Sequence, residues 1–458
     1  MELAVAGVVA VVLMVAVASS SKKLGVAAPL ILVVVGLALS YAPGVPSVAV
    51  PHEWILAGVL PPLLYAAAIK VPVIDFRRNL GAITSLSVVL VLVSAFITGL
   101  VLYALLPELD FAAAVALGAV VSPPDAVAAT SIGKRLGLPP RLVTVLEGEG
   151  LVNDATALVL LRSALAVAAG SMSGVWGGIG DFGYAVSVAV VFGLVIGVVT
   201  VYVRSKLHDP VLDTAISFIV PFLAFIPAEE LGASGVLAVV VAGLYSGHRS
   251  ASSLNAQARI SDNVNWRTVQ FLLENAVFLL MGLELRHLIE NIDEDLLGIP
   301  QAVLIGLLVT AVLVVIRCAW VFPMVFILRR RAARAEHRTL LLWLSLDRAR
   351  GNAPGSARQE RRRRLRQRIY DKRRADLEQE RREGLGWKGA LVLGWSGMRG
   401  VVTLAAGPVP ARFGPLSGTT RPDRLHRGDH HAAPAGRHPT RAHPRPRHPR
   451  RRRDGGPP

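Results

Sequence analysis

Two stretches of the sequence decide the fold: FAAAVALGAVVSPPDAVAATSI at 111–132 and RLVTVLEGEGLVNDATALVLLRSALAVAAG at 141–170. Each is apolar over roughly the 20 residues with which a helix crosses the hydrocarbon core of a bilayer. Each also holds carboxylates, Asp125 in the first and Glu149 and Asp154 in the second. Ionisable groups are costly inside a membrane, so they indicate function. The two stretches therefore predict membrane helices that carry a functional site.

More stretches of this kind lie on either side. The 458 residues are 53% hydrophobic with a mean hydropathy of +0.51, which excludes an ordinary soluble domain. The N-terminal apolar stretch, 2–19, lacks the basic leading region of a secretion signal, so we treat it as a helix. We predict an all-α integral membrane protein with twelve spans, at 2–19, 24–42, 53–71, 83–106, 111–132, 141–170, 184–204, 211–228, 233–247, 267–286, 300–328 and 388–410.

The positive charge alternates between the connections. One set, at 43–52, 107–110, 171–183, 229–232 and 287–299, has no Lys or Arg. Cytoplasmic loops retain Lys and Arg, so the other set should face the cytoplasm of a plasma-membrane protein whose N-terminus lies outside. That set carries Lys22, Lys23, Arg77, Arg78, Lys134, Arg135, Arg141, Arg204, Lys206, Arg249, Arg259 and the Arg-rich stretch from Arg329.

The last third departs from the membrane pattern twice. After eleven spans in 1–328, residues 329–387 mix Arg with Glu and Asp, which suits a solvated helix or a disordered loop, and we interpret them as a charged cytoplasmic linker. The twelfth span at 388–410 follows. Nucleic-acid binding by the basic tail after Pro410 is disfavoured because the tail has no aromatic interleaving and no recognisable module. A single cysteine, Cys318, excludes an internal disulfide.

Residues 411–458 form a tail rich in Arg, His and Pro, a composition that cannot span a membrane or build a core. Three interpretations stay open: an unfolded tail, a metal or anion site at His430 and His431, and a reading frame lost near Gly407. The abrupt end of the last apolar stretch favours the lost frame. Resequencing of the gene tests the lost frame. If no shifted frame encodes another apolar span, this interpretation is wrong.

The first stretch is expected to contain a broken helix. Pro123 and Pro124 remove backbone donors and disfavour helical geometry directly before Asp125. In transporters, broken helices at membrane depth expose carbonyls and helix ends that coordinate ions.

The second stretch separates its polar groups by direction. Glu149 and Asn153 are four residues apart and share a helix face, whereas Asp154 points elsewhere. Arg317 is the only charge deep within 300–328, so we expect a Glu149–Arg317 ion pair, which could equally be a pair that only fixes packing.

Arg399 is a further charge within the last apolar stretch. It lies between Gly397 and Gly400, which permit close helix approach or unwinding. A role only in helix packing is an equal alternative.

These groups suggest a mechanism. A carboxylate in a low-dielectric cavity can hold a proton or a dehydrated cation but not both, so competition for it couples the two fluxes. Sodium and lithium prefer oxygen ligands, which Asp125, Asp154, Thr130 and Thr156 could supply. The pattern predicts a transporter with no resident cofactor, not an enzyme.

Six motifs follow one another over about 1–408. They are PPLLYAAA at 61–68, SPPDAVAAT at 122–130, GEGLVNDATALVL at 148–160, SGVLAVVVAGL at 234–244, FLLENAVFLLMGLEL at 271–285, which contains Glu274 and Asn275, and GMRGVVTL at 397–404. In this order they resemble one family: the chain is similar to bacterial sodium/proton antiporters of the monovalent cation:proton antiporter type, relatives of the animal sodium/proton exchangers. The resemblance implies an inverted-repeat fold of usually thirteen helices, a dimerisation domain, a core domain that moves like an elevator, and a homodimer.

The resemblance also assigns roles. It places the family's Asn-Asp pair on Asn153 and Asp154, with Asp154 as the cation and proton site, and a second aspartate on Asp125. It places a Glu–Arg bridge on Glu149 and Arg317. An Asn-Asp pair is the family's mark of electroneutral exchange of one cation for one proton.

The chain departs from the family at several positions. Gly150 stands where many relatives have Ser, Ala66 where many have an acidic residue, and Pro124 where a hydroxyl residue is usual. The family's final helix has no counterpart after Pro410. The alternative to an antiporter is therefore a truncated, non-transporting remnant, or a membrane-anchored protein that interacts through its basic loop.

Overall fold

The computed structural model describes residues 2–24, 28–43, 55–124, 138–170, 174–207, 209–253, 256–290, 299–350, 357–382 and 387–395. These residues form helices joined by short connections and contain no strand. The expectations for Asp125, Thr130, the Gly397–Arg399–Gly400 motif and the tail from 411 fall outside the described residues.

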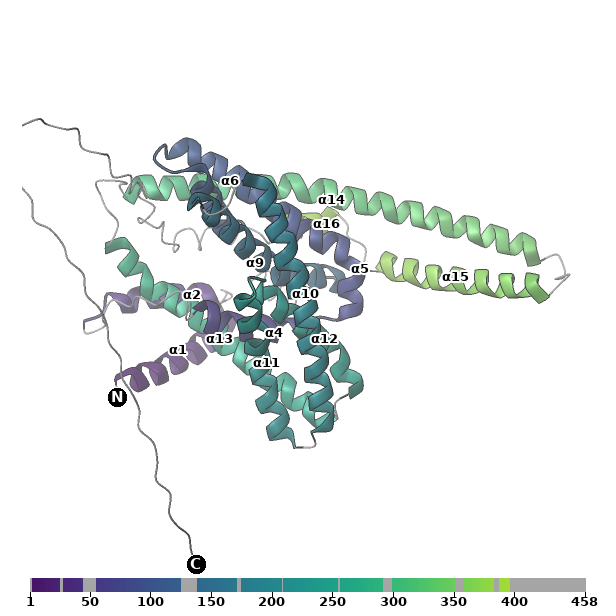
Figure 1. Cartoon of the computed structure of the whole chain (residues 1–458), viewed down its shortest axis with the longest axis horizontal. Coiled ribbons are helices and arrows are strands. Elements are labelled where there is room, and N and C mark those ends of the chain that lie inside the picture. Colours follow the sequence, from purple (N-terminus) through teal and green to yellow (C-terminus); the bar gives the residue numbers. More distant parts are fainter. Residues whose placement is uncertain are drawn as a thin grey trace, which may run out of the picture. The chain divides into compact units, whose positions relative to one another are not determined.

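The helices follow one another along the chain as drawn in Figure 1. The first half contains α1 (Glu2–Leu24), α2 (Ala28–Ser40), the π-helical η1 (Ile55–Val59), α4 (Leu60–Ala68), α5 (Val73–Thr84), the π-helical η2 (Ser85–Leu90), α6 (Val91–Leu105), α7 (Phe111–Val121) and α9 (Pro140–Ala168). The second half contains α10 (Gly174–Lys206), α11 (Pro210–Glu230), α12 (Gly235–Ser253), α13 (Ala256–Glu290), α14 (Ile299–Arg350), α15 (Ala357–Arg382) and α16 (Trp387–Trp395).

The chain is a multi-pass membrane protein. Within the described residues, six helical runs are long and apolar enough to cross a bilayer: Val73–Leu105, Pro140–Ala168, Gly180–Lys206, Pro210–Glu230, Ala256–His287 and Pro300–Arg330. Four apolar helices are shorter: Val5–Ser21, Ala28–Ser40, Ile55–Ala68 and Phe111–Val121. The predicted number of twelve spans stays a prediction.

Several helices are longer than the apolar stretches that predicted them. The stretch 83–106 belongs to a helical run that begins at Val73, and 267–286 belongs to a helix that begins at Ala256. The difference arises because a helix needs only its own backbone hydrogen bonds, so it continues past the point where its side chains become polar.

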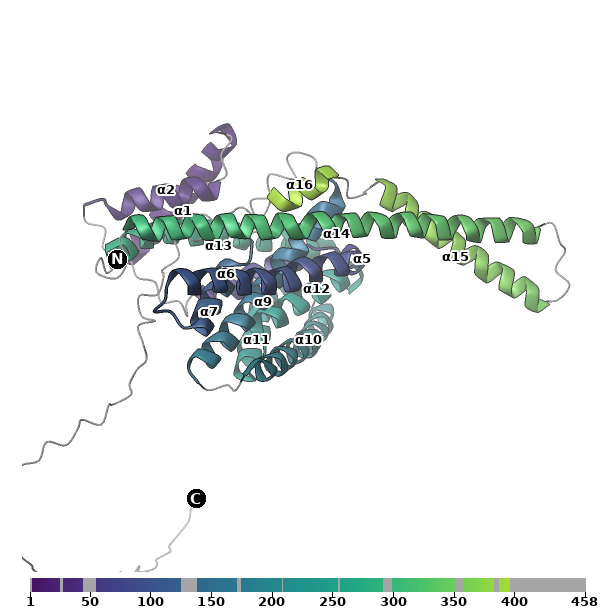
Figure 2. The ribbon, with the colours of Figure 1, turned by 90° about the horizontal axis from the view of Figure 1, so that it is seen from above.

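The charged segment after 329 is largely helical, which settles the choice left open between helix and loop for 329–350 and 357–382. α14 continues from its apolar part to Arg350, and α15 packs against it. We call the part of α14 after Arg330, together with α15, the arm (Figure 2).

Helix α7 is short because of the residues at its two ends. Asp110 caps it, since the carboxylate accepts a hydrogen bond from the backbone N–H of Ala112 at 3.1 Å. It ends at Val121, directly before Ser122, Pro123 and Pro124, where the prolines supply no backbone donors. The chain therefore breaks its helix where the sequence predicted a break.

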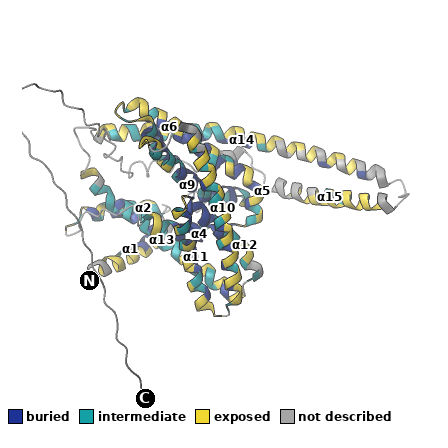
Figure 3. Ribbon diagram, viewed as in Figure 1, coloured by how far each residue is buried: buried dark blue, intermediate teal, exposed yellow. Residues whose placement is uncertain are grey.

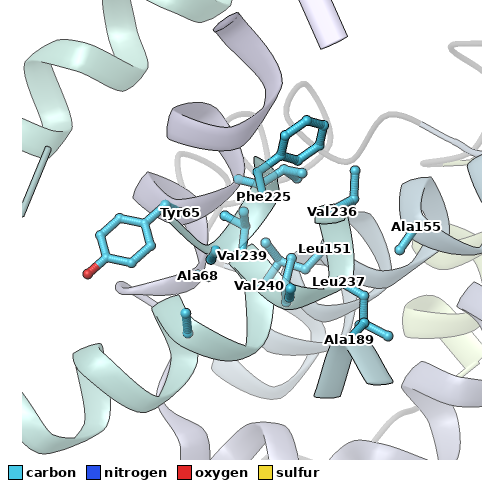
Figure 4. Close-up of a cluster of buried hydrophobic side chains, with 14 of the residues drawn as sticks. Tyr65, Ala68, Leu151, Ala155, Ala189, Phe225, Val236, Leu237, Val239 and Val240 are labelled. Carbon is cyan, nitrogen blue, oxygen red and sulfur yellow. The ribbon is translucent and has the colours of Figure 1, made fainter. Parts of the chain in front are cut away.

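Most residues of α9 are buried or half-buried (Figure 3), and the helix contributes to two apolar clusters. On one side, Leu151 and Ala155 join a cluster built mainly by α4, α10, α11 and α12, which is drawn in Figure 4. On the other side, Leu142, Val145 and Leu146 pack against α5, η2, α14 and α16. α9 and α5 thus contribute to both clusters, since Phe76 and Ile83 of α5 belong to the first and Ala82 to the second. α9 carries the GEGLVNDATALVL motif.

Glycines allow two helix pairs to approach closely. A Cβ on Gly118 of α7 would lie 2.2 Å from the Ala95 carbonyl oxygen of α6, and one on Gly36 of α2 would lie 2.5 Å from the Leu279 carbonyl oxygen of α13. Both distances are far inside van der Waals contact, so these crossings require glycine.

Candidate functional site

Asn153 joins the broken end of α7 to α9. Its side chain is fully buried, and its Nδ2 donates to the carbonyl oxygen of Pro124 at 2.9 Å. That carbonyl is available because α7 has already ended. The Oδ1 of Asn153 is buried and has no hydrogen-bond partner within the described part of the chain. An oxygen in that state is costly unless something occupies the space beside it.

Asp154 follows on the next face of α9 and is half-buried. Thr156 is buried, and its hydroxyl donates to the Val152 carbonyl one turn back at 3.1 Å, which leaves the hydroxyl oxygen able to accept or to coordinate. Asp125 directly follows Pro124 in the sequence but lies outside the described residues, as does Thr130. Of the predicted oxygen ligands, the structure therefore places Asn153, Asp154 and Thr156 within one turn of α9.

Glu149 and Arg317 form a two-pronged ion pair. Arg317 Nη1 lies 2.6 Å from Glu149 Oε1, and Nη2 lies 3.0 Å from Oε2. Glu149 is 1% exposed and Arg317 is 5% exposed, so the pair is withdrawn from solvent. Arg317 Nε also donates to the carbonyl oxygen of Leu393 at 2.9 Å. One guanidinium thus ties α9, α14 and α16 together, one turn from Asn153.

A small cavity lies beside these groups. Its volume is about 20 Å³, large enough to hold water, and its walls come from η2, α6, the end of α7 and α14. Its polar lining consists of Ser94, Ser122, Thr310 and Arg317. Sequence reasoning missed Ser94 and Thr310, although a hydroxyl residue within an apolar stretch was the available signal.

Glu274 and Asn275 make contacts on α13 itself. Glu274 Oε1 accepts a hydrogen bond from Gln270 Nε2 at 2.6 Å, and buried Asn275 donates to the Phe271 carbonyl at 2.6 Å. The side chain of Lys70 also donates to Gln270. These bonds lie within α13 and toward the end of α4, and none of them reaches Asn153.

A second buried ionic cluster was missed from the sequence. Arg204, counted as a loop charge, lies in the last turn of α10 and is 3% exposed. Its Nε and Nη2 donate to the two carboxylate oxygens of Asp213 of α11 at 2.7 and 2.8 Å. It also donates to Asp262 of α13 at 3.0 Å. Ser217 donates to Asp262 at 2.9 Å and accepts from the Trp266 indole at 2.8 Å. The signal was Asp213 within an apolar stretch.

Comparisons with known proteins agree with this architecture. An uncharacterized Na⁺/H⁺ exchanger of Mycobacterium tuberculosis is 33% identical over 320 residues, which are 69% of this chain and 58% of that protein. A sodium, potassium, lithium and rubidium/H⁺ antiporter of Bacillus subtilis is 30% identical over 312 residues, 64% of this chain and 45% of that protein. The chain thus spans less than two thirds of the length of these relatives.

The fold matches a solved structure, that of the sodium proton antiporter MjNhaP1 from Methanocaldococcus jannaschii. The TM-score is 0.57 at 17% sequence identity, over 89% of this chain and 96% of that one. A family model described as "Sodium/hydrogen exchanger, transmembrane" matches residues 8–420. Because that match covers most of the sequence, the chain belongs to the transmembrane sodium/hydrogen exchanger family.

Proposed function

We propose that the protein is a secondary antiporter that exchanges sodium, or potassium or lithium, for protons by alternating access at Asp154. The observation that carries the proposal is the surroundings of Asn153. Its Oδ1 is buried and unpartnered within the described residues, its Nδ2 holds the carbonyl at the broken end of α7, and a carboxylate follows it in the chain. Oxygen atoms gathered at a helix break are a setting in which transporters hold small cations.

The chemistry follows from the cost of a bare charge at membrane depth. An ionised Asp154 needs either a proton or a cation beside it, and one carboxylate cannot hold both. Asn153 Oδ1, Asp125, Thr130 and Thr156 would supply further oxygen ligands of the kind that sodium and lithium accept. Competition for this single site converts a gradient of one ion into movement of the other, with no resident cofactor.

The charges support one-for-one exchange. Glu149 is paired with Arg317, so it adds no net charge to the site, and we assign this pair a structural role. Asn153 is neutral. Asp154 is then the one carboxylate of the Asn-Asp pair, and it exchanges one proton for one monovalent cation. The exchange is therefore electroneutral.

Alternating access requires two groups of helices. We assign α5, η2, α6, α7, α9, α14 and α16 to a group that carries the site, and α1, η1, α2, α4 and α10 to α13 to a scaffold. The scaffold would form the contact of a homodimer in the plasma membrane, with the basic loops in the cytoplasm. Support comes from the two apolar clusters on opposite sides of α9.

The test is proton flux in liposomes that contain the purified protein and a pH-sensitive dye. Addition of sodium, potassium or lithium should move protons in the wild type and produce only background flux in Asp154→Asn, which removes the exchangeable charge. Equal flux in the two proteins would refute the proposal. Flux that is insensitive to a clamped membrane potential supports electroneutral exchange.

The arm supports a second candidate, a membrane-anchored protein that interacts through its basic helix. α15 has twelve Arg or Lys and five Asp or Glu, so it carries a net positive charge, and Arg361, Arg362, Arg366 and Arg368 are exposed. This function predicts that removal of the arm abolishes activity in the cell, whereas Asp154→Asn does not.

A further inference from the structure

A charged contact crosses from the site-bearing helix to the scaffold. Arg162 of α9 donates from Nη2 to Oε2 of Glu229, in the last turn of α11. Arg162 lies eight residues after Asp154, or about 12 Å along the helix. The side chain of Arg162 is 52% exposed and that of Glu229 is 20% exposed, so the pair lies at the rim of the bundle.

The carboxylate of Glu229 is fixed from its other side. Its Oε1 accepts a hydrogen bond at 2.8 Å from the backbone N–H of Gly235, the first residue of α12. The first turn of a helix attracts negative charge, which adds to this bond. Gly235 also makes the room, since a Cβ there would lie 2.7 Å from Glu229 Cγ. Glu229 is thus held by the scaffold, and Arg162 is the partner that can leave.

Apolar side chains make a further contact between α9 and the scaffold. Leu151 and Ala155 of α9 belong to the cluster of Tyr65, Val236 and Val240, and Val152 and Leu158 pack against it. Apolar contacts are not directional, so they tolerate sliding of one surface over another. A hydrogen-bonded ion pair depends steeply on distance and angle, so it distinguishes one position of α9 from another.

We propose that Arg162 and Glu229 form a positioning pair that holds α9 in the arrangement seen here and opens in every transport cycle. The inference rests on the proposed function, because it concerns the movement that alternating access requires. Glu229 lies at the opposite end of α11 from Asp213, the partner of Arg204, and at the predicted connection 229–232, which has no Lys or Arg. In the predicted orientation this is the outer face, so the pair closes the outer side.

The sharpest test joins the two positions covalently. In a Cys318→Ala background, Arg162→Cys and Glu229→Cys are linked by a bifunctional thiol reagent that has a reducible spacer. We expect sodium-driven proton flux to fall to background after linking and to recover after reduction, because α9 can no longer leave the scaffold. Undiminished flux in the linked protein would overturn the proposal, and failure of the reagent to join the pair would contradict the contact itself.

A matched pair within the scaffold provides the control. Tyr184 of α10 donates to the Leu231 carbonyl at 3.1 Å, and both side chains are exposed at the same end of the bundle. Linking Tyr184→Cys to Leu231→Cys should leave the flux intact, since both positions belong to the scaffold. Loss of flux here would show that linking inhibits without regard to α9. Absence of exchange in the unlinked wild type would refute the proposed function itself, whereas exchange that persists in the linked protein would refute only this inference.

Charge substitutions measure how strongly the pair biases the cycle. Arg162→Gln and Glu229→Gln should each change the KM for the cation by up to about five-fold, the range of a partly exposed ion pair. Arg162→Lys, which keeps the charge, should stay closer to the wild type. Wild-type KM values in both Arg162→Gln and Glu229→Gln would contradict the bias.

Discussion

The Glu149–Arg317 pair depends on both of its charges, because each is nearly inaccessible to solvent. Removing one partner leaves the other charge buried and uncompensated, which typically costs about 3–5 kcal/mol, whereas apolar replacement of both is often close to neutral. Replacing either residue alone should therefore destabilise the fold more than replacing both with apolar residues.

We predict that Glu149→Gln lowers the free energy of unfolding by about 3–5 kcal/mol. The double variant Glu149→Leu, Arg317→Met should be more stable than either single variant. Thermal unfolding of the detergent-solubilised proteins measures both effects. A double variant whose loss equals the sum of the two single losses would show that the residues do not act as a pair.

The sequence could predict this site to the extent that its chemistry was local. Glu149 and Asp154 were found because carboxylates are rare within apolar stretches, and Asn153 because it lies between them. The position of Pro123 and Pro124 indicated the end of α7. Arg204 was misjudged because its partners, Asp213 and Asp262, come from other helices, and nothing in the local pattern shows which ends of which helices meet. The same reason hid the Arg162–Glu229 contact.

Helices α6 and α7 cross at contact distance. The crossing places Gly118 against the Ala95 carbonyl and Gly99 against Val115, whose Cα would lie 2.8 Å from a Cβ at position 99. α7 leads directly to the helix break, so the separation of these two helices sets where Pro124 and its carbonyl lie relative to Asn153.

Substitution of Gly118 by Ala should lower the free energy of unfolding by about 1–3 kcal/mol, the usual cost of inserting atoms into a full interior. It should also reduce proton flux, because α7 must shift away from α6. Gly81→Ala is the matched control. A Cβ there meets no atom within 4 Å, so it should stabilise α5 by about 0.5–1 kcal/mol. Equal stability of the two variants, measured by thermal unfolding, would count against a tight crossing.

Most helices were predictable as elements, and their ends were not. Apolar runs located α9, α10 and α11 because a membrane imposes one length on everything that crosses it. The same rule gives no end for α14, whose helix outlasts its apolar part by some 20 residues, from Arg330 to Arg350. Charged residues such as Arg334 and Glu336 are good helix formers, so composition alone left helix and loop equally open there.

At the scale of the whole molecule, the arm is separate from the site in its contacts. α15 packs on α14, and the ion pair with Glu149 lies far along α14 at Arg317. If the protein is an antiporter, the exposed arginines of the arm take no part in binding the cation.

Replacement of residues 335–378 by a flexible Gly/Ser linker should therefore leave sodium-driven proton flux unchanged. Flux in liposomes, compared at equal amounts of folded protein, gives the measurement. Loss of flux despite normal thermal unfolding would mean that the arm belongs to the mechanism. Loss of a cellular activity with intact flux would favour the second candidate function.

Helix α14 extends without a sharp bend from the ion pair to the far end of the arm (Figure 2). Arg350 lies 33 residues after Arg317, which corresponds to about 50 Å of helix. A rod of that length works as a lever, so a rocking of α14 by a few degrees about Arg317 sweeps its tip through several ångströms. A fluorescent dye placed at the tip would thus magnify movements that are too small to detect beside the Glu149–Arg317 pair.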